Sequence, residues 1–212
     1  MTEHINNFIV IYPSNKDGFD RVREILSRTD GRKITETSWW FADIFVDASD
    51  ATPTHKQAAL PEWNIENIGS ENAVIVHYSQ DDNIQMSIFS SDTPVSKGAE
   101  KLARLIASAD DHVILMHQYD SDEANLWGAH VYGGKSYHAG REGTILPQFF
   151  ADRPALAATW DAARNDWVRD EDGNLTEEAK EAKAILEEDG LVFIDEHQTA
   201  AFKACMPKWR QV

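Results

Sequence analysis

The fold is decided by residues 63–138, WNIENIGSENAVIVHYSQDDNIQMSIFSSDTPVSKGAEKLARLIASADDHVILMHQYDSDEANLWGAHVYGGKSYH. Three segments of this stretch are rich in β-branched or aromatic residues and are bounded by polar turn residues, as strands usually are. They are residues 73–79 (AVIVHYS), 83–89 (NIQMSIF) and 112–119 (HVILMHQY). The connection between the first two is short and polar, which suits a hairpin.

A helix is predicted between the second and third of these strands. In residues 97–109 the apolar side chains recur at spacings of three and four, so they form one inward stripe. Ser96 is the expected N-cap of this helix. Residues 126–132 alternate again, and the glycines at 133–134 permit a tight reversal into residues 135–138. The expected order is β-β-α-β-β.

The chain upstream adds a strand at residues 5–12, a helix at 17–27 and a further strand at 39–47. An insertion follows near residues 48–59. Together these elements predict an α+β protein with a ferredoxin-like antiparallel sheet, helices on one face and a helical C-terminal extension.

Two phrases of the deciding stretch carry a family likeness. They are Trp63-Asn64-Ile65-Glu66-Asn67-Ile68-Gly69, which precedes a hydrophobic strand, and Ile88-Phe89-Ser90-Ser91-Asp92-Thr93-Pro94-Val95, which precedes the helix. With a strand that ends at Tyr119 and with Gly128 after an acidic turn, they resemble the YubB/Api92-like proteins of plasmids, prophages and phages. The resemblance implies a ferredoxin-like fold and a mobile-element origin, and it brings no defined activity.

The likeness covers roughly residues 60–138, and its extension to residues 1–47 is weaker. The chain departs from the family pattern at three places. Ile68 stands where an aromatic residue is usual, Glu71 replaces a basic residue, and Thr93-Pro94 is a reduced form of the family's proline element.

The last third of the chain changes from strand to helix patterns, so we expect two units, residues 1–143 and 144–212. Residues 147–167 have a broken helical pattern with Pro154 as a helix start, and Thr176 caps a helix at 177–188. Residues 191–194 (LVFI) are predicted to be a short strand, followed by a helix at 199–206. The apolar face of this part is too small to be stable alone, so it should pack on the sheet.

Composition places the chain among proteins of the cytoplasm. Cys205 is the single cysteine, which removes any intramolecular disulfide and fits a reducing compartment. The first residues, MTEHINN, lack the basic flank and apolar core of a signal peptide. No apolar run approaches membrane-spanning length.

The net charge of −16 has two interpretations: acidity that serves solubility alone, or a surface for a basic partner. Such a surface repels phosphate backbones, so direct nucleic-acid binding is disfavoured and a basic protein surface is the expected partner. Residues 161–189 contain eleven acids and four bases. The predicted partner-binding residues are Asp161, Asp166, Asp170, Glu171, Asp172, Glu177 and Glu178. The other interpretation of this density is a solvated helical face.

No cofactor or metal is predicted. The run Gly133-Gly134-Lys135-Ser136 lacks the earlier glycine of a phosphate loop, and its hairpin context is wrong. The run Asp170-Glu171-Asp172-Gly173 resembles a calcium loop, but the ligating positions do not fit when Gly173 is placed sixth.

Strand residues offer an alternative site. His117, Tyr119, Glu123 and His130 could converge on one sheet face as a small-molecule or catalytic site. Strand histidines are, however, more often packed against neighbours, and no close histidine pair of a metal motif is present. A third alternative is a homodimer formed through a sheet edge or through tryptophans, since Trp39 and Trp40 must point to opposite faces of a strand.

The sequence therefore favours a non-enzymatic acidic binding protein of a mobile element. It would engage a basic protein surface and inhibit a host defence or nucleic-acid enzyme by imitating its charged ligand.

Overall fold

The computed structural model describes residues 4–27, 39–45, 61–81, 83–121, 125–151, 153–161, 164 and 166–208. The strands are β1 (His4–Tyr12), β2 (Trp39–Trp40), β3 (Ala73–Gln80), β4 (Ile84–Ser91), β5 (Ile114–Ser121), β6 (Leu126–Gly133), β7 (Tyr137–Thr144), β8 (Trp160–Asp161) and β9 (Asp166–Trp167). The helices are α1 (Lys16–Ser27), the 3-10 helix η1 (Phe41–Phe45), α3 (Pro61–Asn67), α4 (Ser96–Ala107), α5 (Ile145–Ala151), α6 (Pro154–Ala157) and α7 (Glu177–Cys205).

One antiparallel sheet organises the fold, with its strands in the order β2-β3-β4-β1-β5-β6-β7. Six of these strands are eight or nine residues long, and β2 adds two residues at one edge. The short strands β8 and β9 pair separately. The prediction of an α+β protein built on an antiparallel sheet is confirmed.

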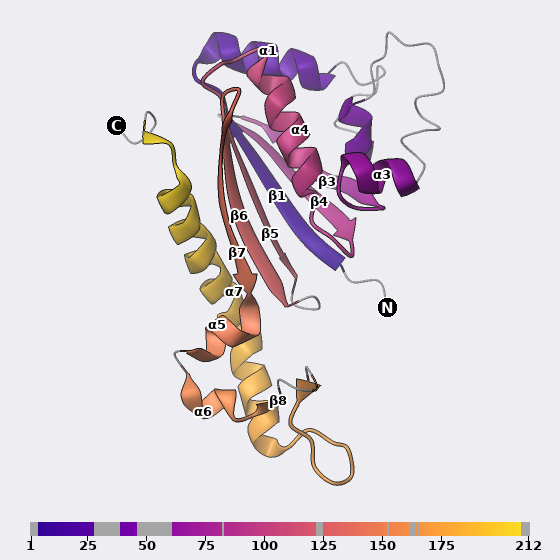
Figure 1. Cartoon of the computed structure of the whole chain (residues 1–212), viewed down its shortest axis with the longest axis vertical. Helices are drawn as coiled ribbons and strands as arrows, with labels where there is room; N and C mark the ends of the chain where they lie inside the picture. Colours follow the sequence, from indigo (N-terminus) through magenta and orange to yellow (C-terminus); the bar gives the residue numbers. More distant parts are fainter. Residues whose placement is uncertain are drawn as a thin grey trace.

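The first face of the sheet packs against α1 and α4 (Figure 1). Alternate residues of β1, including Ile9 and Ile11, point into this core, because successive side chains of a strand face opposite ways. The apolar stripe of α4 meets them with Leu102 and Ile106, both fully buried. The stripe predicted from the spacing of apolar residues is the face that packs.

The second face carries a separate core under α7, which lies on the opposite side of the sheet from α4 (Figure 1). Trp127 and Val131 of β6 pack there with Phe193 and Phe202 of α7. The C-terminal extension therefore packs on the sheet, as predicted. Only part of α7 does so, since its first half extends past the sheet beside α5 and α6 (Figure 1).

The start of α4 corrects one prediction. Ser96 is the first helical residue, and the N-cap is Val95, whose side chain makes no capping bond. The backbone N–H of Val95 donates to Asn7 Oδ1 (3.0 Å), and that of Gly98 donates to the Ile68 carbonyl (3.0 Å). The N–H groups at this helix end that lack an intrahelical partner thus donate to groups of distant elements. The side chain of Ser96 was expected to accept from them instead.

The predicted strand at residues 191–194 is wrong. These residues lie inside α7, which runs unbroken for 29 residues. Phe193 and Ile194 are buried against the sheet, whereas Leu191 and Val192 are exposed. A run of four apolar residues cannot by itself distinguish a strand from a helix, and here packing on the sheet decides for the helix.

Three further boundaries differ from the predictions. The strand expected at 39–47 ends at Trp40, because the fully buried Phe41 begins η1. Residues 135–138 were expected only as the return from a tight reversal, whereas the structure has a further strand, β7, from Tyr137 to Thr144. Trp160 and Trp167, expected in a broken helix, form the β8–β9 pair. The side chains of Trp39 and Trp40, and the insertion at 48–59, lie outside the described residues.

Candidate functional site

The predicted partner-binding carboxylates lie around β8, β9 and the start of α7, at the lower end of Figure 1. Trp160 and Trp167 hold the hairpin, with ring centroids 5.3 Å apart in edge-to-face contact. The ring of Trp167 also meets Phe150 of α5 at 6.0 Å. The aromatic contacts therefore fix the position of this acidic end, defined here as residues 161–178.

A tight turn carries three of these carboxylates, Asp170, Glu171 and Asp172. The carboxylate of Asp170 accepts the backbone N–H groups of Asp172 (3.0 Å) and Asn174 (2.9 Å). Asp170 thus has a structural task in the turn. Glu171 and Asp172 occupy the tip, and both are exposed.

Every base of residues 161–189 is paired with an acid of the same segment. The pairs are Arg164–Asp161 (3.4 Å), Arg169–Asp166 (2.9 Å), Lys180–Glu177 (2.6 Å) and Lys183–Glu187 (3.8 Å). Exposed pairs of this kind add little stability. Because of these ion pairs, Asp161, Asp166 and Glu177 are less available to a partner protein.

The pKa values at this end follow the pairing. The hydrogen bond from Arg169 lowers the pKa of the Asp166 carboxyl, and the backbone N–H of Trp167 lowers it further. The hydrogen bond to Glu177 raises the pKa of Lys180. Both shifts favour the charged forms, of Asp166 and of Lys180. The predicted carboxylates outside these ion pairs are Asp170, Glu171, Asp172 and Glu178, which are all exposed.

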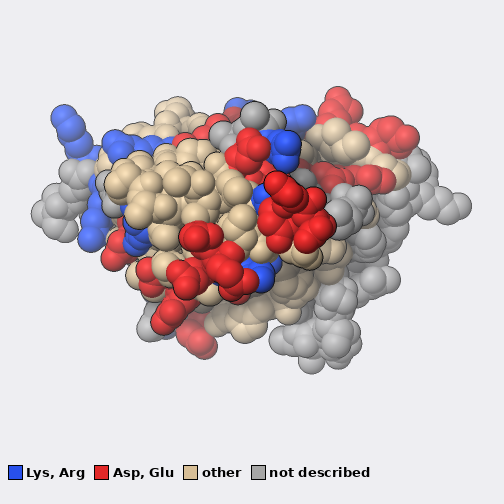
Figure 2. Space-filling model, turned by 90° about the horizontal axis from the view of Figure 1, so that it is seen from below, with Lys and Arg blue, Asp and Glu red and all other residues tan. Residues whose placement is uncertain are grey.

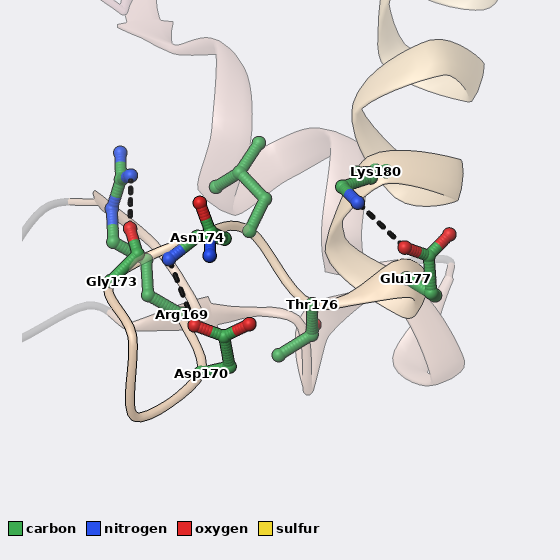
Figure 3. A pocket seen from close by; sticks show the side chains of 8 residues that line it. Arg169, Asp170, Gly173, Asn174, Thr176, Glu177 and Lys180 are labelled. Carbon is green, nitrogen blue, oxygen red and sulfur yellow. Dashed lines mark hydrogen bonds and ion pairs between the residues drawn. The ribbon is translucent and has the colours of Figure 1, made fainter.

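Figure 2 views the molecule from this end, with acidic side chains gathered in several groups and basic side chains among them. A hollow of about 570 Å³ opens between the turn and the start of α7. Figure 3 shows that its lining groups bond one another: Arg169 with the Gly173 carbonyl, Asn174 with Asp170, and Lys180 with Glu177. The polar groups of this hollow are thus already satisfied, so it is a weak candidate for a small ligand.

The sheet brings together three of the four residues of the alternative site, His117, Tyr119 and His130. His117 of β5 pairs in register with His130 of β6, and Tyr119 pairs with Gly128, which pairs in turn with Glu142 of β7. His117, Tyr119, His130 and Glu142 therefore share one face of the sheet. Glu123 lies outside the described residues.

Two glycines make room for this cluster. A Cβ atom at Gly128 would collide with the ring of Tyr119, and one at Gly140 would collide with the ring of His130. Each ring lies over the backbone of the neighbouring strand. Glycine is needed at both positions because of close approach, with no positive φ involved.

The cluster is linked by hydrogen bonds and by stacking. Tyr119 Oη donates to Glu142 Oε2 (2.7 Å), and His130 Nδ1 lies 3.2 Å from His138 Nε2. The rings of Tyr132 and His138 stack with centroids 4.5 Å apart and an interplanar angle of 3°. Glu142 was missed from the sequence because the predicted order ended with the strand at residues 126–132, and no further strand was predicted around residue 142. A strand extended through the Gly140–Gly143 segment would have placed it opposite Gly128.

Asn7 connects the cluster to the rest of the fold. Its Oδ1 accepts the backbone N–H of Val95 (3.0 Å) and lies 3.1 Å from His117 Nε2. An amide oxygen can only accept, so we assign the proton of His117 to Nε2. His117 Nδ1 and His130 Nε2 are then buried nitrogen atoms without a hydrogen-bond partner among the described residues.

The pKa shifts of the cluster all favour uncharged side chains. Burial lowers the pKa of His117 to about 3, with a further contribution from His130. Burial also lowers the pKa of His130, helped by His138 and opposed by Glu142. Burial raises the pKa of Tyr119, and its hydrogen bond to Glu142 adds to this. None of these shifts moves a group toward a general acid or base at neutral pH.

The described residues do not form a metal centre either. In the part of the chain that the structure describes, no group of three or more His, Cys, Asp or Glu side chains could hold a metal ion. The hollows at the start of α7, beside β5 and over β1 include none of the cluster's side chains.

Comparison with known proteins finds no matching family model, curated protein or solved structure. The resemblance to the YubB/Api92-like proteins therefore stays a prediction. Among the described helices, none is long and apolar enough to cross a membrane.

Proposed function

We propose that this chain is a non-enzymatic binding protein whose acidic end engages a basic surface of a partner protein. The observation that carries the proposal is the pairing pattern of residues 161–189. Eleven acids stand against four bases, and each base is already held by an acid of the same segment. The segment has a net charge of −7 (4 − 11), and no base in it is left without an acid beside it.

The physical basis is electrostatic complementarity. Exposed carboxylates of one sign speed up encounter with a basic partner and disfavour wrong partners. Their effect falls with salt, because the Debye length is about 8 Å at physiological ionic strength. Glu171 and Asp172, at the tip of a turn anchored by Asp170, are the residues we expect to contribute most.

We further infer a ferredoxin-like core and a mobile-element origin. The neighbouring order β3-β4-β1-β5, with α1 and α4 as the connecting helices, supports the first. The resemblance of residues 60–138 to the YubB/Api92-like proteins supports the second. In that setting the partner would be a host nucleic-acid or defence enzyme, and the carboxylates would occupy its phosphate-binding groove.

Charge reversal tests the binding role. The double variant Glu171→Lys/Asp172→Lys should bind the captured partner at least about tenfold more weakly, because two attractive charges become repulsive. The partner is first captured from host lysate on the immobilised wild-type chain, and its dissociation constant is then measured at several salt concentrations.

The matched control is Asp20→Lys/Glu71→Lys, which makes the same charge change at exposed positions far along the chain. It should bind nearly as the wild type does. Equal loss in both variants would mean that only net charge matters. Unchanged binding by the Glu171→Lys/Asp172→Lys variant, or a captured partner without a basic surface, would reject the proposal.

A small-molecule site at His117, Tyr119 and His130, completed by Glu142, is the second candidate. The convergence of these side chains across β5, β6 and β7 favours it. The pKa directions favour packing, since they keep both histidines neutral and Tyr119 protonated.

A further inference from the structure

We propose that the half of the second sheet face beside α7 binds a basic amphipathic helix of a partner protein. This surface, called the shelf below, consists of the outward residues of β1, β3 and β4, and α7 forms its side wall. It is separate from the acidic end, and the proposal does not rest on the role of that end.

The dimensions of the shelf suit one helix. α7 packs on β5, β6 and β7, and β1, β4 and β3 continue the sheet beyond it. Three strands about 4.8 Å apart make a strip roughly 14 Å wide. A helix with its side chains is about 10–12 Å across. One helix laid beside α7 would therefore cover this half of the face.

The floor of the shelf is apolar. Phe8, Val76 and Phe89 line a hollow of about 270 Å³, together with Asn6, Ser87 and Asp120. Phe89 is 49% exposed and Val76 is 46% exposed, although both lie in regular strands. Contiguous exposed apolar side chains in the middle of a sheet face indicate a binding surface.

The wall of the shelf is apolar as well. A second hollow, of about 470 Å³, lies between Met116 of β5 and Thr199, Phe202 and Met206 of α7. Met116 pairs in register with Val10 of β1, so this hollow adjoins the floor. Leu191, which is 66% exposed, lies eleven residues or about three turns before Phe202 and so on the same side of the helix.

Charge decides which occupant fits. Between His4 and Tyr12, and along β4, the side chains directed to the shelf are uncharged: Asn6, Phe8, Val10, Gln85, Ser87 and Phe89. Among the described residues that line the floor hollow, Asp120 is the charged one, and it accepts a hydrogen bond from Asn6 Nδ2 (3.3 Å). From Ile185 to Phe202, α7 carries five acids and no lysine or arginine. Glu187 pairs with Lys183 and Asp189 with Arg153. Glu188 and Asp195, eleven and four residues before Thr199, lie on the shelf side of the helix. In the part of the chain that the structure describes, Lys203 at the end of the wall is the one base that lines either hollow.

A second copy of this chain is the competing occupant. It would also offer exposed apolar residues, Leu191 and Val192 of its own α7. It would, however, bring the acids of α7 against Asp120 and against the acids of the first α7, where like charges repel. A helix with an apolar stripe flanked by Lys or Arg matches both the apolar surface of the shelf and the carboxylates beside it, Asp120, Glu188 and Asp195.

The experiment uses two synthetic peptides of about 18 residues, a length of about 27 Å as a helix. One carries leucines at helical spacing and lysines elsewhere, and the other has glutamates in place of the lysines. Binding to the full chain is measured by calorimetry. The Leu/Lys peptide should bind, and Phe89→Ser or Leu191→Ser should each weaken it at least about tenfold. Both side chains are largely exposed, so neither change should unfold the chain, which circular dichroism checks.

Two controls separate this site from general charge attraction. Ile65→Ser removes an apolar side chain on α3 that is 50% exposed, and Glu171→Lys/Asp172→Lys alters the acidic end. Both should bind the Leu/Lys peptide as the wild type does. The proposal is overturned if the peptide does not bind, if Phe89→Ser and Leu191→Ser bind it unchanged, or if the Leu/Glu peptide binds equally well. It is also overturned if sedimentation finds a dimer that Phe89→Ser dissociates, because the occupant is then a second copy.

Discussion

His117 is a polar residue that the fold buries completely. The strand HVILMHQY marks it as one polar residue in an apolar run, and in the structure it is fully buried. Asn7 Oδ1 accepts a hydrogen bond from the Nε2–H group of His117. Burial lowers the pKa of His117 from 6.5 to about 3. The folded chain therefore holds this side chain neutral over a pH range in which the unfolded chain would protonate it.

This difference predicts an acid-sensitive stability. Between about pH 6.5 and pH 3 the unfolded state binds more protons at His117, so stability falls as the pH falls. The slope from this one group approaches about 1.4 kcal/mol per pH unit. In His117→Gln, which keeps an N–H donor for Asn7, this part of the slope should vanish. Urea unfolding of the two proteins at pH 7, 6, 5 and 4 measures it, with the exposed His77→Gln as control. An unchanged slope in His117→Gln would show that other groups cause the acid loss.

At the scale of elements, α7 joins the two parts of the chain. Its first half lies beside α5 and α6, and its second half packs on β6 and β7. The helix begins where predicted, because Thr176 Oγ1 accepts the backbone N–H of Ala179 (3.2 Å). It continues through Gly190 because the sheet supplies an apolar surface for its second half.

Neighbouring residues of α7 should therefore respond very differently to truncation. Phe193→Ala should lower the free energy of unfolding by roughly 3 kcal/mol, because it leaves a cavity against Phe149. Val192→Ala, at a position 61% exposed, should change it little. Chemical denaturation measures both variants. Similar losses in the two variants would contradict the burial of Phe193 beside the exposed Val192.

At the scale of the whole molecule, charge is distributed unevenly. Residues 161–189 hold a net charge of −7 out of −16 for the chain, although they are 29 of 212 residues. Self-repulsion of this kind opposes the compact state and is screened by salt. A segment that opposes folding in this way is easier to explain by a binding role than by stability.

The free protein should accordingly gain stability when this charge is reduced. Glu171→Lys/Asp172→Lys should raise the unfolding temperature by roughly 2 °C in low salt. The gain should largely disappear in about 1 M salt, where the Debye length is near 3 Å. Scanning calorimetry at both salt concentrations measures it. A loss of stability in the variant would mean that these carboxylates support the turn, and would weaken the case for a docking surface.

The sequence by itself determined the elements whose signals are local. Apolar periodicity predicted β1, β3, β4, β5 and β6 and the helices α1 and α4, and Thr176 marked the start of α7. These succeed because each depends on the alternation or helical spacing of neighbouring residues. The prediction of a strand for the run LVFI was wrong because four consecutive apolar residues fit both the strand period and the helix period.

The tertiary structure alone decided which residues meet. It set Glu142 opposite Gly128 beside Tyr119, paired three of the predicted docking carboxylates with bases, and left Phe89 exposed beside α7. Strand register and the choice of sheet face join residues far apart in the chain. They depend on how whole elements pack, and a single sequence read locally does not contain that information.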